Sequence, residues 1–304
     1  MSQFKIKHFL ITRFNVKRVP LLNPERSTLD KNSKTVLTNE WMDKRFKLFQ
    51  NYCLPSITNQ SNQEFIWLIY FGSEDTKPKY KQLIQKLSQD NSCFIAKYVK
   101  DSREMNQAVK KDIANLIDQE TDFLITTRID NDDALHEDAI EKIQKTFYDN
   151  INELIIQKQY QKIGINLKKG YCLQVEPYFE ITRHELTSSP FVSLAEKVNY
   201  INQEFSTVIS QPHQSFTEQT EFPLIQIDDH CYWIQVIHEN NVSNIVQGFP
   251  IYNKYRLTKF NIDIDTLYLN KIDFYKTIIR YIKEIMNTKL IKPIAYKINT
   301  FYRI

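Results

Sequence analysis

Three aspartates crowd into one short segment of this chain, TTRIDNDDAL at residues 126–135, as Asp130, Asp132 and Asp133. Carboxylates this close repel one another unless a cation or hydrogen-bond donors compensate their charge. Carboxylate oxygens are ligands that Mg²⁺ and Mn²⁺ prefer. Such ions take few protein carboxylates and fill their other positions with water and substrate phosphates. The segment therefore predicts a site for a metal-bound diphosphate.

A simpler interpretation gives these aspartates a structural role. Asp132 or Asp133 can cap the helix that the following residues predict, and the other carboxylates then stay in water. The two roles are compatible, with Asp133 as the cap and Asp130 and Asp132 as ligands. Arg128 is expected either to pair with these carboxylates or to contact a phosphate of the ligand.

The acidic segment follows an apolar run, and similar runs alternate with helical patterns through the first half of the chain. Apolar, β-rich runs predict four buried strands, at residues 8–14, 64–72, 92–99 and 122–129. Helices are predicted at about 39–57, capped by Thr38 or Asn39, at 77–89 and at 103–119. This alternation indicates βαβ crossovers and a largely parallel sheet. Ligands bind beyond the carboxyl ends of such strands, so we expect the residues after each strand to surround one cleft.

The pattern changes after residue 135. A helix is predicted at 136–147, followed by an antiparallel hairpin at 162–181 that turns at Lys168–Gly170. Residues 182–222 are predicted to be rich in loops, and 230–238 to form a further strand. The expected architecture is an α/β fold with a mainly parallel half followed by a mixed, loop-rich half.

Composition narrows the function classes. Among 304 residues there are only 4 glycines and neither a GxGxxG nor a GxxxxGK[ST] segment, so a glycine-rich phosphate loop is not expected. The formal charge of +4 falls short of the pattern typical of nucleic-acid-binding proteins. The start lacks a signal-peptide pattern, and no apolar run approaches the ~20 residues that span a bilayer, which predicts a cytoplasmic protein that at most rests on a membrane. Four scattered cysteines without a CxxC pair predict reduced thiols: Cys53, Cys93, Cys172 and Cys231.

Five segments resemble, in order, the rhamnosyltransferase family of GT-A-fold glycosyltransferases (family 2-like). They are FLITRFN, WMDKRFKLFQNYCLPSI, FIWLIYF, LITTRIDNDDAL and WIQVIHENNVSN, and the match runs from about residue 8 to residue 247. The resemblance implies a Rossmann-like nucleotide-diphospho-sugar transferase fold. It also implies transfer of a sugar, with rhamnose suggested by the family, from such a donor to a glycan or lipid-linked acceptor in surface polysaccharide synthesis.

The resemblance further implies roles for individual residues. Asp130 and Asp132 are expected to hold Mn²⁺ or Mg²⁺ and the donor's diphosphate. His238, at the end of the strand WIQVIH, is expected to complete the ligands of the metal. Arg13 and Asn15, at the end of the first strand, are expected to face the nucleobase and ribose. The alternative for each is a polar residue at a strand end that binds no ligand.

An inverting enzyme also needs a carboxylate to deprotonate the acceptor hydroxyl. The candidates lie in the second half of the chain: Glu185, Glu196, Glu221, Asp228 and Asp229. Glu196 is preferred because its segment SLAE resembles an S-L-x-E pattern of the family. The alternative is a solvated residue in a helix that begins near Ser193. A retaining enzyme requires no such base.

The chain is expected to form one glycosyltransferase domain, residues 1–270, and a C-terminal amphipathic helical segment, residues 271–304. The domain divides into a nucleotide-sugar-binding half, 1–134, and an acceptor-binding half, 135–270. The C-terminal segment mixes Ile, Tyr, Met and Phe with Lys and Arg. Such a helix either packs its apolar stripe on its own domain, which we favour, or lies on anionic lipid where lipid-linked acceptors are found.

Two other functions stay open on the sequence alone. Clustered aspartates near a strand end also suit a metal-dependent nucleotidyltransferase, although that class usually carries a glycine-rich or basic phosphate loop early in the chain. A catalytically degenerate carbohydrate-binding protein with a GT-A fold is the other alternative. The presence of both Asp130 and Asp132 argues against it.

Overall fold

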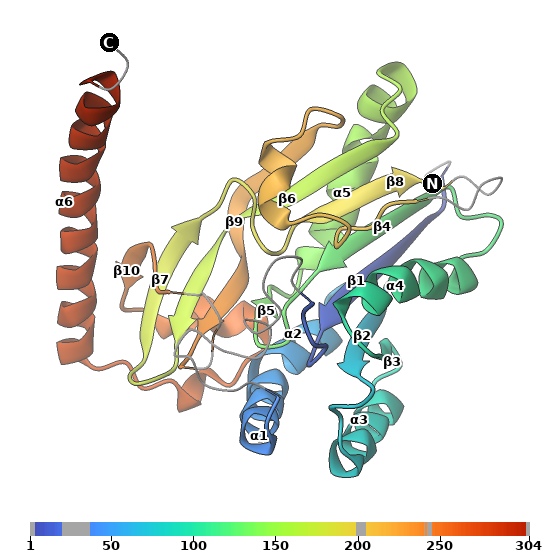
Figure 1. Ribbon diagram of the computed structural model, residues 1–304, viewed down its shortest axis with the longest axis horizontal. Coiled ribbons are helices and arrows are strands. Elements are labelled where there is room, and N and C mark those ends of the chain that lie inside the picture. Colours follow the sequence, from blue (N-terminus) through green and yellow to red (C-terminus); the bar gives the residue numbers. More distant parts are fainter. Residues whose placement is uncertain (1–3, 20–36, 199–204, 240, 242–244, 302–304) are drawn as a thin grey trace.

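Four parallel strands form one half of the sheet, in the order β3, β2, β1, β4 (Figure 1). They are β1 (Ile6–Arg13), β2 (Ile66–Gly72), β3 (Phe94–Val99) and β4 (Phe123–Arg128). The computed structural model describes residues 4–19, 37–198, 205–239, 241 and 245–301, and the side chains of the last helix as far as Met286. The four strands predicted for the first half, and their parallel arrangement, are confirmed.

Helices cover both faces of these strands because the strands are apolar on both sides. Leu10 of β1 packs into the core under α3 (Pro78–Asp90) and α5 (Ala139–Ile151), whereas its neighbours Phe9 and Ile11 pack into the core under α4 (Ser102–Leu116). Successive side chains of a strand point to opposite faces, so a continuous apolar run fills two cores.

The predicted helix at 39–57 is one helical rod with a wide turn in its middle. Its parts are α1 (Asn39–Leu48), the π-helical segment η2 (Phe49–Cys53) and α2 (Leu54–Thr58). The Thr38 hydroxyl caps the start by accepting from the Trp41 N–H at 3.2 Å, as predicted. The rod lies beside the carboxyl ends of β1 and β4, and it brings a charged side chain, that of Arg45, into the interior.

The second half extends the same sheet with mixed strand directions. From β4 outward, the order continues with antiparallel β8 (Ser193–Lys197), then β6 (Lys162–Gln174), β7 (Glu180–Glu185) and β10 (Phe249–Ile251). β9 (Leu224–Ile237) runs beside β6, and β5 (Ala134–Leu135) pairs with β9. The short helical segments of this half are η3 (Asn152–Gln157), η4 (His213–Thr217), η5 (Lys254–Phe260) and η6 (Ile264–Thr266). The expected architecture, a parallel α/β half followed by a mixed half, is confirmed.

The predicted hairpin exists, but its turn is misplaced in the prediction. β6 continues through Lys168–Gly170 to Gln174, and the chain turns before β7 begins at Glu180. At Lys168 the pairing of β6 with β9 is irregular in register. Gly170 leaves room for the indole ring of Trp233, because a Cβ at this position would lie 2.0 Å from Trp233 Cδ2. The turn-like residues therefore mark a bulge and a close approach.

The last helix, α6 (Lys271–Phe301), stands at the edge of the molecule beside β10 and β7 (Figure 1). The expectation that it packs its apolar stripe on its own domain holds for part of the helix, since the rings of Phe274 and Tyr281 contact those of Tyr252 and Phe249. Ile272 and Tyr275 are exposed, whereas the polar Thr277 is buried. Among the helices of the described chain, none combines the length and apolar content needed to cross a bilayer.

Candidate active site

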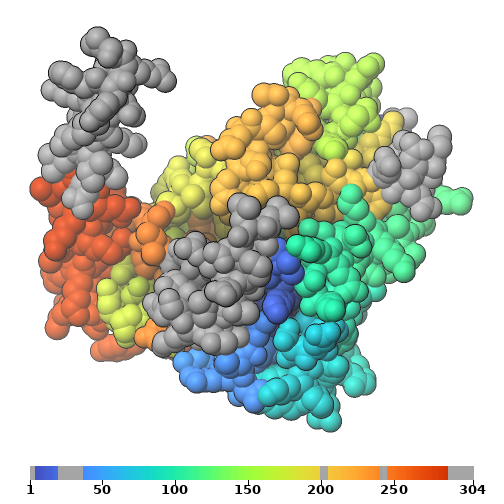
Figure 2. All heavy atoms as spheres, in the orientation of Figure 1, coloured from blue at the N-terminus to red at the C-terminus, as the bar shows by residue number. Residues whose placement is uncertain are grey.

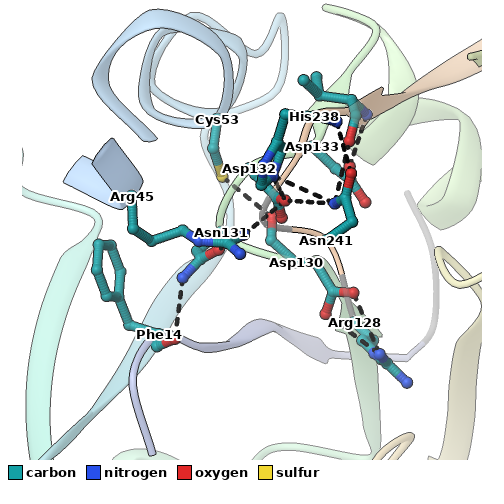
Figure 3. A network of polar contacts seen from close by, with 11 residues as sticks. Phe14, Arg45, Cys53, Arg128, Asp130, Asn131, Asp132, Asp133, His238 and Asn241 are labelled. Atoms are coloured by element: carbon teal, nitrogen blue, oxygen red, sulfur yellow. Dashed lines mark hydrogen bonds and ion pairs between the residues drawn. The ribbon is translucent and has the colours of Figure 1, made fainter. Parts of the chain in front are cut away.

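The acidic segment leaves the carboxyl end of β4 and lies next to the ends of β1 and the α1–α2 rod (Figure 3). Asn131 ties these elements together. Its amide nitrogen donates to the Phe14 carbonyl oxygen at 3.0 Å, and its oxygen accepts from Arg45 Nη1 at 3.1 Å. The Cys53 thiol donates to the Asp130 carbonyl oxygen at 3.6 Å. The backbone of the segment is thus held from three sides before any ligand is considered.

Asp132 is a buried carboxylate surrounded by donors. Its Oδ2 lies 2.5 Å from Arg45 Nη1, 2.8 Å from His238 Nε2 and 3.3 Å from the amide nitrogen of Asn241 (Figure 3). Burial alone opposes ionisation, but the Arg45 guanidinium and the His238 imidazole lower the pKa of Asp132 to about 2. Asp132 is therefore a fixed negative charge at neutral pH.

Asp130 points away from Asp132 and pairs with Arg128 (Figure 3). Arg128 Nη2 lies 3.2 Å from Asp130 Oδ1, and both side chains are partly exposed. Burial opposes the charge of Asp130, but Arg128, with a contribution from Arg13, lowers its pKa below the ordinary value. The predicted pairing of Arg128 with the acidic cluster is present.

Asp133 does not cap a helix. Its Oδ1 accepts from the Val236 N–H of β9 at 2.9 Å, and its buried Oδ2 has no partner within the part of the chain that the structure describes. Burial, with the charges of Asp132 and Asp130, raises its pKa well above the ordinary value. The capping interpretation is wrong because β5 intervenes between the acidic segment and α5, which begins at Ala139.

A cavity of about 340 Å³ opens beside Asp130. Its wall carries three arginines, Arg13, Arg18 and Arg128, and is completed by the first turns of α4 and by residues 209–212. Burial and the nearby Arg18 lower the pKa of Arg13 to about 10, which still leaves the guanidinium charged at neutral pH. Three guanidinium groups against one carboxylate make the cavity suited to an anion with several oxygens.

Asn15 is not placed to meet a ligand, although its sequence position suggested it. The side chain is buried, accepts from the Gly72 N–H at 3.0 Å and donates to Thr76 Oγ1 at 3.0 Å. It therefore joins the end of β1 to the loop after β2. Arg13, predicted together with it, does line the cavity.

Glu196 lies near the opposite end of β4 from Asp130, too far from the cavity beside Asp130 to act there as a base. It sits in strand β8, not in a helix, and is paired with Leu124 near the amino end of β4. Asp130 is six residues further along, about 20 Å at the rise of a strand. The Glu196 carboxylate accepts from the Ser206 N–H at 2.6 Å and lies 3.5 Å from Lys162 Nζ, so it fastens a loop.

The expected metal ligands come together only in part. His238 and Asp132 are in contact, whereas Asp130 is turned toward Arg128. Within the described residues there is no group of three or more His, Cys, Asp or Glu side chains that could hold a metal ion. The charge compensation at Asp132 comes from Arg45 instead.

Sequence reasoning missed Arg45 and Asn241. A signal for Arg45 was available, because it stands at helical spacing among Met42, Phe46 and Phe49, which are all buried. A charged residue inside an apolar stripe needs a buried partner. Asn241 gave no such signal, since one asparagine in a polar segment is unremarkable.

A larger cavity, about 740 Å³, lies at the opposite end of the sheet. It is lined by residues that start β1 and β2, among them Lys5, Lys7 and Glu64. Ligands of open α/β sheets bind at the carboxyl ends of the strands, where the arginines and aspartates gather. Chemistry and topology therefore outweigh volume, and the smaller cavity is the candidate site.

Comparison with known proteins gives one family and several distant structures. The family described as "Putative rhamnosyl transferase" matches residues 7–249. Among curated proteins, no match to the chain was found.

Several solved structures are similar to this chain at low identity. S. aureus TarS 1-349 has 13% identity and a TM-score of 0.38, with 76% of this chain and 60% of that chain covered. The same fragment in complex with UDP-GlcNAc has 13% identity and a TM-score of 0.41, covering 89% and 64%. A "putative nucleotide-diphospho-sugar transferase" from Desulfovibrio desulfuricans G20 has 9% identity and a TM-score of 0.34, covering 79% and 84%. The chain thus spans less than two thirds of the TarS fragment, and similarity at this level transfers neither a ligand nor a residue role.

Proposed function

The chain belongs to the rhamnosyl transferase family that matches residues 7–249, and from this premise we propose that its cavity beside Asp130 binds a nucleotide-diphospho-sugar donor. The protein is a glycosyltransferase. The observation that carries the proposal is the set of Arg13, Arg18 and Arg128 around one carboxylate at the carboxyl ends of parallel strands. The sugar that the family suggests is rhamnose, and the proposed acceptor is a glycan or a lipid-linked glycan of a surface polysaccharide.

The arginines supply what the leaving group of this reaction needs. When the glycosidic carbon departs, negative charge grows on the diphosphate, and charged donors fixed beforehand stabilise it without reorganisation. Arg13 lines the cavity, and Arg128 is held there by its pair with Asp130. Guanidinium groups bind phosphate oxygens in a bidentate manner, so they also orient the donor.

A divalent ion, Mn²⁺ or Mg²⁺, is part of the proposal. Mg²⁺ is usually held by one or two carboxylates, with substrate phosphates and water as its other ligands, so a complete protein cage is not required. Asp132 and His238 contact each other at 2.8 Å, and Asp130 stands in the wall of the cavity and pairs with Arg128. The donor types suit such an ion, and Asp130, Asp132 and His238 would hold it once these contacts are exchanged for the ion. The ion would neutralise charge on the leaving diphosphate.

A lipid-linked acceptor would place the enzyme at the cytoplasmic surface of a membrane. The acceptor's approach is from the mixed half, whose strands β8 and β9 pair with β4 and β5 respectively. Since Glu196 lies at the far end of β4, we do not assign it the role of base.

Binding and turnover of UDP-, dTDP- and GDP-linked sugars, with Mn²⁺ and with chelator, test this function. Arg13→Gln is expected to weaken nucleoside diphosphate binding about 10- to 100-fold, the usual worth of a charged hydrogen bond. Asp130→Asn and Asp132→Asn are expected to abolish turnover of the one productive donor. The matched control is Arg183→Gln, which removes an exposed arginine that pairs with Glu185.

The outcomes separate the alternatives. Binding of a nucleotide that survives Arg13→Gln unchanged would place the donor elsewhere. Failure to bind any nucleotide diphosphate would remove the proposal and leave a carbohydrate-binding protein with a transferase fold. Turnover at the same rate with and without chelator would support the transferase proposal and contradict the proposed metal ion.

A further inference from the structure

The last helix, α6, turns one apolar stripe outward, while its protein-facing side carries both polar groups and aromatic rings. It is attached to the body along β10 and β7, and its described turns lie at the outer edge of the molecule (Figure 2). A helix on the surface of a soluble domain normally shows the reverse arrangement, with the apolar stripe toward the core.

The inward side of α6 is held by polar contacts and by two ring contacts, Phe274 with Tyr252 and Tyr281 with Phe249. Arg280 Nη2 and Nε lie 2.6 and 3.1 Å from Glu180 Oε1, and Arg280 Nη1 donates to the Val246 carbonyl oxygen at 2.9 Å. Glu180 is buried in β7, and Thr277, one turn earlier on the helix, is also buried. A buried, multiply bonded ion pair fixes the rotation of the helix about its axis, because any other rotation leaves Glu180 unpaired.

The outward side carries a continuous apolar stripe. Its members are between 49% and 70% exposed: Ile272 at 70%, Tyr275 at 63%, Ile279 at 53%, Ile282 at 49% and Met286 at 55%. They follow one another at alternating spacings of three and four residues. At ~100° per residue they therefore fall within an arc of about 80°. An exposed apolar surface of this kind marks an interaction site.

Lysines border the stripe on both sides. Lys276 and Lys283 follow it on one edge and Lys271 on the other, and all three are exposed. The two acidic residues of the described turns lie on the other side of the helix, where Asp273 is buried and pairs with Lys276 at 2.8 Å and Glu284 pairs with Arg280. The outer face of α6 is thus apolar in the middle, positive at its margins and free of carboxylates over the described turns.

We propose that this face of α6 lies on an anionic lipid surface, with the stripe in the headgroup–acyl boundary and the lysines among the lipid phosphates. Apolar residues flanked by lysine are the pattern of helices that lie in a membrane interface, and tyrosine suits the same depth. A second copy of the chain fits less well, since a helix pair formed through this stripe would bring lysine margins together with no carboxylate on that face to offset them. The inference goes beyond the transfer reaction and does not depend on it.

Vesicle flotation of the full chain tests the contact. The wild type is expected to float with equimolar phosphatidylglycerol and phosphatidylcholine, and not with phosphatidylcholine alone. Ile279→Ser combined with Ile282→Ser is expected to abolish flotation. Lys271→Gln combined with Lys283→Gln is expected to weaken it about 30-fold, from roughly a factor of five for each lysine near an anionic surface. The matched control is Ile156→Ser, a similarly exposed isoleucine in η3, which is expected to float as the wild type does.

A second measurement separates lipid from protein as the partner. Tyr275→Trp is expected to show a blue-shifted emission on addition of the anionic vesicles. Flotation that is unchanged in Ile279→Ser/Ile282→Ser, or no flotation of the wild type, would overturn the proposal. So would a wild-type dimer in light scattering that the same double variant converts to a monomer, because a second copy would then cover the stripe. Nucleotide binding does not enter these readouts, so the donor proposal can fail or stand separately.

Discussion

The guanidinium of Arg45 lies 2.5 Å from the carboxylate of Asp132, and both side chains are almost fully buried. The arginine comes from the helical rod after β1, and the aspartate comes from the loop after β4. One ion pair therefore locks together the two elements that frame the candidate site. Because Asp132 also contacts His238 from the end of β9, the pair links both halves of the sheet.

Replacing Arg45 tests how far the fold depends on this pair. Arg45→Gln is expected to lower the free energy of unfolding by ~3–5 kcal/mol, because it leaves a buried carboxylate without its strongest partner. The double variant Arg45→Gln/Asp132→Asn should lose less unfolding free energy than the sum of the losses of the two single variants, because either single change already breaks the pair. Chemical denaturation measures all three variants.

The control for this series is Arg183→Gln, whose exposed ion pair should be worth less than ~0.5 kcal/mol. Additive losses for Arg45→Gln and Asp132→Asn would show that the two groups do not interact in solution.

Asp133 makes a prediction about pH. Its pKa is raised above the ordinary value of 3.8, so between that pH and its folded-state pKa the folded chain holds a proton that the unfolded chain has released. The stabilisation is complete below the unfolded pKa and is lost as the pH rises through the folded pKa. Asp133→Asn keeps an acceptor for the Val236 N–H and removes the titration.

The variant should therefore gain stability over the wild type as the pH rises from about 4, by ~1.4 kcal/mol per pH unit until the folded-state pKa is passed. Below pH ~3.8 the two proteins should be equally sensitive to pH. Urea denaturation across this range measures the difference. A difference that stays constant from pH 3 to pH 8 would mean that Asp133 is not protonated in the folded protein.

Asn15 separates a structural role from a ligand role. Asn15→Ala leaves the buried Gly72 N–H without an acceptor and is expected to cost ~1–3 kcal/mol of unfolding free energy. Nucleotide binding by the folded fraction should change little, because the side chain does not reach the cavity. Asn91→Ala, which removes a single contact to the Leu87 carbonyl oxygen, is the control. A loss of binding with stability intact would restore the role in nucleobase recognition that the sequence suggested.

Structural features that depend on local sequence pattern can be predicted from this sequence, whereas the side-chain contacts between residues far apart in the chain cannot. Apolar runs and helical spacing predict β1 to β4 and their helices, and strand topology then places Asp130 and Arg13 at one cleft. Asn15 and Glu196 have the right residue types, but their partners, Gly72 and Ser206, lie 57 and 10 residues away. No spacing rule in the sequence indicates that these side chains are already occupied.

The outward stripe of α6 also shows what sequence pattern alone cannot predict, namely which way a helix faces. Its three- and four-residue spacing is legible in the sequence, but the pattern is the same whether the stripe faces the core or the surroundings. What decides the matter is Arg280, because its partner Glu180 lies on β7, 100 residues earlier. Tertiary ion pairing sets the rotation of the helix, and sequence periodicity cannot.

Gly170 offers the sharpest test of the corrected hairpin. In the interior of β6, a Cβ at this position would lie 2.0 to 2.4 Å from three atoms of the buried Trp233 ring, which is stacked on Phe191 and donates from Nε1 to the Leu167 carbonyl oxygen at 2.7 Å. The ring has no free space to move into. Gly170→Ala is therefore expected to destabilise the protein by ~3 kcal/mol or more, at the upper end of overpacking costs.

Gly164→Ala is the matched control on the same strand. Its Cβ would meet Leu224 Cδ1 at 2.8 Å, the far end of a flexible side chain that can turn aside. The loss there should stay within ~1 kcal/mol. Thermal or chemical denaturation compares the two, with Trp233 fluorescence as a local readout that should change in Gly170→Ala only. Equal, small losses at both glycines would mean that Gly170 lies in a turn after all, where an added methyl group meets water instead of the indole ring.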